Sequence, residues 1–98
     1  MAYRLIWSPI ARLDLNEIVA YIREDDPLAA QLFLRRLIQA LERLPDFPES
    51  GRIVPEFANR TIRELIRPPC RIIYRISPRT ERIEIVRVWH AARGTPRV

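Results

Sequence analysis

The hydrophobic positions of the first half of the chain repeat with helical spacing, after one short segment that alternates. Residues 3–7 place Tyr3, Leu5 and Trp7 on one face, which predicts a strand. Ser8-Pro9 is typical of a helix start, because a hydroxyl caps the first turn and proline fits its first position. An apolar stripe then predicts a helix that ends at the acidic residues 24–26. The stripe consists of Ala11, Leu15, Ile18, Val19 and Ile22.

A second helix is predicted to begin almost at once, because Asp26-Pro27 repeats the signal of a cap followed by proline. Pro45 and Pro48 end it. So short a connection predicts an antiparallel helical hairpin. Residues 45–59 are rich in proline and predict a long surface loop. The apolar stripe of the second helix consists of Ala30, Phe33, Leu34, Leu37, Ile38, Leu41 and Leu44.

The second half of the chain changes to the alternation that is typical of strands. Three strands are expected, at residues 60–66, 70–77 and 82–90. The alternation fails at Ile85-Val86, which indicates a bulge or a strand that is covered on both faces.

These elements predict an α+β fold for a single domain over residues 1–98. An N-terminal strand and an antiparallel helical hairpin precede a three-stranded antiparallel meander, with both helices on one face of the sheet. In the central strand, Ile72, Tyr74 and Ile76 share one face, while Arg71 and Arg75 share the other. We therefore expect an open, basic outer face that carries Arg71 and Arg75, and Arg63 with them.

Charge is distributed unevenly between the two halves. Residues 1–50 hold 6 Arg and 8 acidic residues, a net charge of −2, whereas residues 51–98 hold 11 Arg and 4 acidic residues, a net charge of +7, which together give +5. All 17 cationic residues are arginine, whose planar fork suits carboxylate and phosphate groups. This asymmetry predicts an anionic partner, either nucleic acid or an acidic protein.

The composition argues against several classes of function. One Cys and one His argue against a disulfide framework and a metal site, and two Gly are too few for a nucleotide-binding loop. We therefore expect no cofactor and no metal. No apolar stretch approaches the length of a membrane span and no export signal is visible, so we expect a cytoplasmic protein without a membrane partner.

Only one catalytic constellation is compatible with this composition. Cleavage of RNA through its 2′-hydroxyl group needs an acid, a base and cations at the phosphate. His90 would act as the acid or base, and the cations would come from Arg63, Arg71, Arg75, Arg87 and Arg93. The alternative is that His90 merely ends a strand and that the arginines form a solvated face.

Cys70 and the aromatic residues have structural readings as well. A pair between Cys70 and His90 would require adjacent strands in register, and a small buried cysteine is the simpler interpretation. The strand positions of Trp89 and of the other aromatic residues favour the core over a base-stacking platform.

An ordered set of segments over residues 3–93 resembles the ParE-type toxins of the ParE/RelE superfamily. The N-terminal part of the resemblance is Tyr3-Arg-Leu-Ile-Trp-Ser-Pro-Ile-Ala, followed by Asp14-Leu-Asn-Glu-Ile and Tyr21-Ile. The C-terminal part is Pro48-Glu-Ser-Gly-Arg, Arg63-Glu-Leu-Ile, Arg71-Ile-Ile-Tyr-Arg and Ile85-Val-Arg-Val-Trp-His-Ala-Ala-Arg.

The resemblance implies a toxin of a type II toxin–antitoxin module, neutralised by a small antitoxin whose partly disordered tail wraps it. ParE-like members inhibit DNA gyrase, whereas RelE-like members cleave mRNA on the ribosome. The chain resembles ParE more, because it has no lysine and has Ile66 where the RelE-like pattern has a catalytic arginine. It departs from the ParE pattern where Pro68-Pro69-Cys70 replaces Gly-Pro-Tyr.

Three hypotheses follow from the resemblance. The first is a gyrase inhibitor that is not an enzyme. The second is a ribosome-dependent mRNA endonuclease that uses Arg63, Arg71, His90 and Arg93. The third is a degenerate, non-toxic relative.

In each case we expect the antitoxin to cover apolar surface on the helical hairpin and to pair acidic residues with Arg71 or Arg75. The wider set expected to bind antitoxin or target is Arg63, Arg71, Arg75, Arg87, Trp89, His90 and Arg93. Residues 94–98 are expected to form a loose, frayed tail, with a target-binding segment as the alternative.

Overall fold

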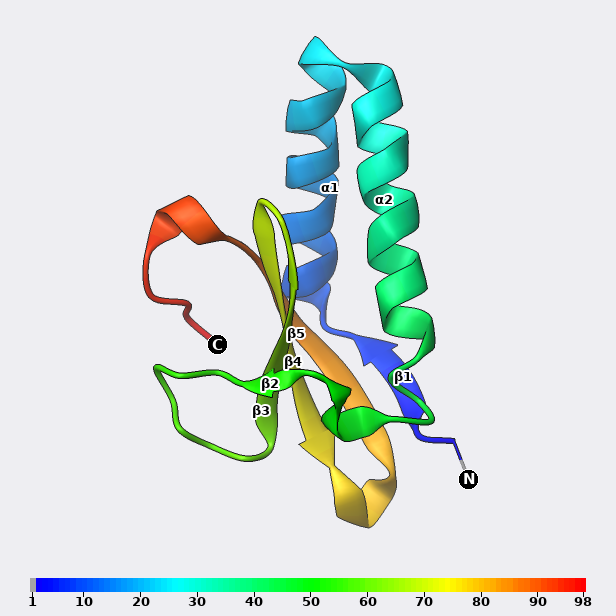
Figure 1. Cartoon of the computed structure of the whole chain (residues 1–98), viewed down its shortest axis with the longest axis vertical. Coiled ribbons are helices and arrows are strands. Elements are labelled where there is room, and N and C mark those ends of the chain that lie inside the picture. The colour runs from blue at the N-terminus through cyan, green and yellow to red at the C-terminus, as the bar shows by residue number, and fades with distance from the viewer. Residues whose placement is uncertain (1) are drawn as a thin grey trace.

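The computed structural model describes residues 2–98 and places two long helices on one side of a five-stranded sheet (Figure 1). The helices are α1 (Pro9–Asp25) and α2 (Pro27–Glu42), and the strands are β1 (Arg4–Trp7), β2 (Arg52–Ile53), β3 (Ile62–Arg67), β4 (Cys70–Ser77) and β5 (Arg82–His90). Short 3-10 turns cover Pro48–Ser50, Pro78–Thr80 and Ala91–Arg93. The predicted α+β architecture is confirmed, with the hairpin and the meander where the sequence places them.

Both helix starts are capped as the sequence predicts. The hydroxyl of Ser8 accepts a hydrogen bond from the backbone N–H of Ala11 at 3.1 Å, and the carboxylate of Asp26 accepts one from Ala29 at 3.1 Å. Asp26 has an extended backbone and also donates its own N–H to the carbonyl of Ile22. A single residue therefore ends α1 and begins α2, which makes the hairpin tight. In Figure 1 the hairpin extends beyond the end of the sheet.

The sheet contains two strands more than the predicted meander. Its order is β1-β5-β4-β3-β2, with β1 parallel to β5 and the other pairs antiparallel. Strand β1 joins because the hairpin returns the chain across one face, and the two-residue β2 lies within the expected loop 45–59. Ile73 pairs with Arg87 and Tyr74 pairs with Ile85, so Val86 is the extra residue of a bulge. The irregularity at Ile85-Val86 is therefore a bulge.

The outer face of the sheet is partly covered, which corrects the expectation of an open basic face. A small apolar core there consists of Val54, Ile62, Ile73, Val86 and Trp89, with Phe57 packed against it. It is separate from the main core between the sheet and the helices. Two chain segments cover this small outer core. The loop after β2 supplies Val54 and Phe57, and the C-terminal segment lies against Trp89.

The C-terminal segment is attached rather than loose. The indole N–H of Trp89 donates to the carbonyl of Gly94 at 3.1 Å, and Arg87 donates to the carbonyl of Arg97 at 3.2 Å. Pro96 is buried. The expectation of a frayed tail is wrong, because these contacts come from β5 and are invisible in the tail's own sequence.

The loop before β2 is fixed by the phenol of Tyr74. The hydroxyl of Tyr74 donates to the carbonyl of Pro48 at 2.7 Å and accepts from the N–H of Gly51 at 2.9 Å. A Cβ atom on Gly51 would lie 2.5 Å from the Tyr74 oxygen and 2.6 Å from the carbonyl oxygen of Glu64. The segment Pro48-Glu-Ser-Gly-Arg therefore needs its glycine because backbone and ring approach so closely.

We predict that Gly51→Ala destabilises the protein, by about 1–3 kcal/mol, because the added methyl group must displace either the Tyr74 ring or β3. Chemical denaturation of the purified protein measures this change. Ser50→Ala, at the exposed neighbouring position, should leave the free energy of unfolding within about 0.5 kcal/mol. Equal stability of Gly51→Ala and Ser50→Ala would contradict the close approach.

Candidate functional site

Arg63 holds the loop before β2 and does not share the outer face with Arg71. It lies opposite Tyr74 in the β3–β4 register, and residues paired in this way point to the same face, here the helix side. Its guanidinium group donates to the carbonyls of Glu49 and Gly51 and forms an ion pair with the Glu49 carboxylate at 3.1 Å. These contacts give Arg63 a structural role.

Arg71 does lie on the outer face, within a chain of four alternating charges. Its Nε donates to the fully buried carboxylate of Glu64 at 2.6 Å, and its two Nη atoms bind the two oxygens of Glu56 at 2.8 and 2.7 Å. Arg52 donates its Nε to the other oxygen of Glu64 at 2.6 Å. The hydrogen bonds with Arg71 lower the pKa of Glu56 to about 2, and Glu56 in turn raises the pKa of Arg71. By contrast, Arg75 is exposed on the same face.

Arg87 crosses the edge of β5 to reach helix α1. Its Nε and Nη2 bind the two oxygens of Asp14 at 2.7 and 2.9 Å, and the same carboxylate accepts the backbone N–H of Val88 at 3.1 Å. Asp14 raises the pKa of Arg87 through these hydrogen bonds. The guanidinium carbons of Arg87 and Arg93 lie 4.9 and 4.3 Å from the centre of the Trp89 ring. Trp89 is only 2% exposed, so its ring is unavailable for stacking on a base.

His90 points to the helix side of the sheet, away from Arg71. It lines a cavity of about 370 Å³ with Glu17 and Tyr21 of α1 and with Arg93. Its Nδ1 accepts the N–H of Ala92 at 3.1 Å. Arg67 is level with His90 across the sheet, because both lie in register with Cys70. Arg63 is four residues from Arg67 along β3, so Arg63 and His90 are about 13 Å apart in the strand direction. Of the predicted set, Arg87 and Arg93 pack on Trp89, and Arg93 also lines the His90 cavity. Arg63, Arg71 and Arg75 lie apart from them.

Cys70 and His90 are directly opposite each other in the β4–β5 register. The strands are thus adjacent and in register, which is the condition that a cysteine–histidine pair requires. Cys70 is 1% exposed, however, and burial raises the pKa of its thiol to about 11. The thiol form is inert at neutral pH, so Cys70 belongs to the core.

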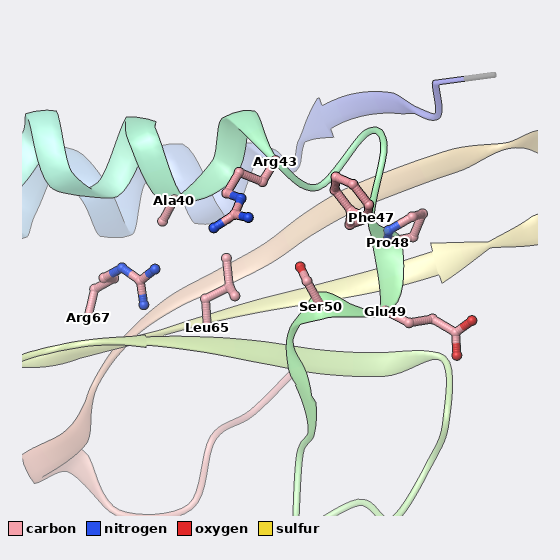
Figure 2. Close-up of a pocket in the computed structure, with 8 residues that line it drawn as sticks. All are labelled: Ala40, Arg43, Phe47, Pro48, Glu49, Ser50, Leu65 and Arg67. Atoms are coloured by element: carbon pink, nitrogen blue, oxygen red, sulfur yellow. The ribbon is translucent and has the colours of Figure 1, made fainter.

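A groove between α2 and β3 carries arginines that sequence reasoning missed. The cavity at its wider end has a volume of about 630 Å³, and neighbouring hollows of about 310 and 390 Å³ share Arg67 with it. Figure 2 shows Arg43, at the C-terminal end of α2, and Leu65 and Arg67 of β3 extending into the space between the two elements. We call this the α2–β3 groove. Its central residues are Arg36, Ala40, Arg43, Phe47, Leu65 and Arg67.

The three arginines of the α2–β3 groove are available to bind an anionic group. Arg36, Arg43 and Arg67 form no ion pair with any acidic side chain within residues 2–98. Alanines at the helix positions that face the strand keep the space open. A signal was present in the sequence, because Arg36 and Arg43 are seven residues apart and so share one face of a helix. From the sequence alone, that helix face would be interpreted as exposed to solvent. The groove becomes evident only in the structure, where β3 lies beside it.

Comparisons with known proteins agree with this fold. Residues 5–94 match the family described as the ParE toxin of the type II toxin–antitoxin system, parDE. The chain belongs to the ParE toxin family. This toxin is 40% identical over 91 residues to the toxin RelE2 of Caulobacter vibrioides, an alignment that covers 92% of this chain and 97% of that protein.

Two solved structures share the fold of this toxin. One is the chromosomal ParDE toxin–antitoxin system of P. aeruginosa, with a TM-score of 0.73 and 21% identity over 91% of this chain and 96% of that one. The other is the RelBE2 toxin–antitoxin complex of Mycobacterium tuberculosis, with a TM-score of 0.52 and 22% identity over 92% of this chain and 99% of that one. The family match over residues 5–94 confirms the resemblance to the ParE-type toxins, and the similar proteins carry both ParE and RelE names.

Two kinds of feature are absent from residues 2–98. No helix in this part of the chain is long and apolar enough to cross a membrane. Nor do three or more His, Cys, Asp or Glu side chains gather there in a way that would hold a metal ion.

We predict that the ion pair between Glu56 and Arg71 makes stability depend on acid pH. The folded-state pKa of Glu56 is about 2, below the ordinary value of 4.5. The stabilisation is therefore complete above about pH 4.5 and is lost as the pH falls towards 2. Urea unfolding of the wild type and of Glu56→Gln at several pH values measures it. The difference between the two proteins should shrink on acidification, and a difference that is independent of pH would contradict the pair.

Proposed function

We propose that this toxin acts in the cytoplasm by binding and inhibiting DNA gyrase, and that a cognate antitoxin neutralises it by docking in the α2–β3 groove. The observation that supports binding over RNA cleavage is the separation of the predicted catalytic groups. His90 lies on the helix side of the sheet, Arg71 lies on the outer face, and Arg63 is tied to the loop at Glu49 and Gly51.

A nuclease site requires these groups to meet. An acid or base and at least one cation must reach the same phosphate at hydrogen-bond distance. Instead, the guanidinium groups of Arg63, Arg71 and Arg87 each bind a carboxylate of this chain. A binding protein needs no such convergence, so dispersed arginines are compatible with gyrase inhibition.

One observation favours the second candidate, a ribosome-dependent mRNA endonuclease. His90 and Arg93 share a cavity with Glu17 and Tyr21, and these four side chains include an acid, a base and a cation. The 40% identity to a toxin named RelE2 points the same way. The labelling experiment is therefore designed to distinguish the two targets.

The antitoxin surface is argued from charge and shape. The α2–β3 groove is lined by apolar Ala40 and Leu65 and by arginines that form no ion pair within the described residues 2–98, so it suits a segment with alternating acidic and apolar side chains. Arg71 is a poorer partner than the sequence suggested, because Glu56 and Glu64 already occupy its fork.

We predict that induction of this toxin without its antitoxin stops DNA synthesis before protein synthesis. Pulse-labelling with thymidine and methionine at successive times after induction measures both. An earlier loss of methionine incorporation would replace the gyrase proposal with the nuclease proposal, and His90→Ala should then restore growth. Unimpaired growth with normal levels of toxin would identify a degenerate, non-toxic relative.

We predict that reversing the groove charges, with Arg36→Glu and Arg67→Glu together, weakens antitoxin binding at least about tenfold at low salt. The matched control reverses Arg35 and Arg79, which are exposed and lie outside the groove. Surface plasmon resonance with immobilised antitoxin measures the affinities. Equal losses in both double variants would show that net charge matters and that the groove does not.

A further inference from the structure

The fork of Arg71 is held by a carboxylate that is independent of Glu56. Glu64 is fully buried, and its two oxygens bind the Nε atoms of Arg71 and Arg52. This leaves the terminal Nη1 and Nη2 atoms of Arg71 pointing away from Glu64, side by side. Two parallel N–H groups on a fixed guanidinium group are the donor arrangement that fits an oxyanion.

Glu64 also gathers a second guanidinium group at the same place. Because one carboxylate binds both Nε atoms, the groups of Arg52 and Arg71 must lie within a few ångströms of each other. The side chain of Arg52 is 58% exposed. Without Glu56, two arginines and Glu64 would leave a net local charge of +1 and four terminal nitrogens with N–H groups to donate.

Glu56 can leave this position without the loop unfolding. Its side chain is 31% exposed and belongs to the loop after β2. The loop is fixed on either side of Glu56 by apolar contacts of Val54 and Phe57 and by the hydrogen bonds that the Phe57 and Ala58 N–H groups donate to the Val54 carbonyl. A rotation of the Glu56 side chain is therefore sufficient to expose the Arg71 fork.

We propose that Arg71 and Arg52 form a phosphate-binding site that Glu56 occupies and closes in the free protein. A carboxylate has two oxygens and satisfies Arg71 alone, as Glu56 does. A phosphate group has further oxygens for Arg52. The site is separate from the proposed antitoxin surface, because it lies on the opposite side of the sheet from the α2–β3 groove.

The tethered carboxylate sets the affinity of the site. Glu56 competes with an effective concentration in the millimolar range or above, since it is joined to the same chain. Phosphate should therefore bind the wild type only weakly, and removal of the Glu56 charge should reveal the site.

The experiment titrates inorganic phosphate into wild type and Glu56→Gln while the Arg71 Nε–H resonance is followed by NMR. We expect the dissociation constant of the variant to be at least about tenfold lower. The matched control is Glu49→Gln, which changes net charge equally, but the exposed Glu49 pairs with Arg63 on the helix side. It should behave as the wild type. Adding Arg52→Gln to Glu56→Gln should reverse most of the gain.

Several outcomes would overturn the proposal. Equal phosphate affinity in Glu56→Gln, Glu49→Gln and wild type would show that Glu56 closes no site. Shifts at Arg36 or Arg67 in place of Arg71 would move the site to the groove. Acetate that binds Glu56→Gln as tightly as phosphate would assign a carboxylate ligand.

The source of the phosphate is resolved by two further probes. Tighter binding of dimethyl phosphate would support an internal phosphate of a nucleic-acid strand, and tighter binding of methyl phosphate would support a terminal phosphate. Failure of both probes to bind Glu56→Gln would overturn the site. Neither result alters the labelling test of gyrase inhibition, so the two proposals can fail separately.

Discussion

The buried carboxylate of Asp14 completes the edge of β5 at the point where its parallel neighbour has already ended. Strand β1 pairs only with Arg82–Ile85, although β5 continues to His90. Beyond that point, α1 supplies the missing partners. The Ser8 hydroxyl donates to the carbonyl of Val86, and Asp14 accepts the N–H of Val88 while it binds the fork of Arg87. Because an unpaired buried backbone group is costly, these side chains let a four-residue strand support a nine-residue one.

Beyond the bulge, alternation along β5 places Arg87 and Trp89 on the outer face and His90 on the helix side. Arg87 then reaches across the edge to Asp14, Trp89 is covered by the C-terminal segment, and His90 lines the cavity beside α1. Arg63 and Arg71 form similar ion pairs within the chain, so their guanidinium groups are already occupied in the free protein. The net positive charge of the sheet half is therefore a poor guide to its binding surface. Part of the charge that is available lies in the α2–β3 groove, where Arg36 and Arg43 come from the acidic half of the chain, and Arg75 remains exposed on the outer face.

Local signals predicted most of the fold, and long-range contacts account for what was missed. Ser8-Pro9, Asp26-Pro27 and the alternation in residues 70–77 act over a few neighbouring residues, so the helix starts and the meander could be predicted. The parallel pairing of β1 depends on a partner strand far along the chain. Strand β2 and the attached C-terminal segment depend on nearer partners, in β3 and β5, that no periodic pattern indicates. The same reason explains the site residues. Alternation put Arg71 on the correct face, but nothing local shows that Glu56 and Glu64 will meet it there.

The motif residues that reveal the family are largely those that build the fold. Tyr74 of the Arg71-Ile-Ile-Tyr segment binds Gly51 and Pro48 of the Pro48-Glu-Ser-Gly segment, and Arg63 binds the same loop. A resemblance carried by such residues reports a shared scaffold, and it holds whichever target a member has acquired. The choice between gyrase and the ribosome must therefore rest on side chains that do not build the scaffold. In this toxin they include His90 and Arg93, which belong to the family segments but line the cavity beside α1.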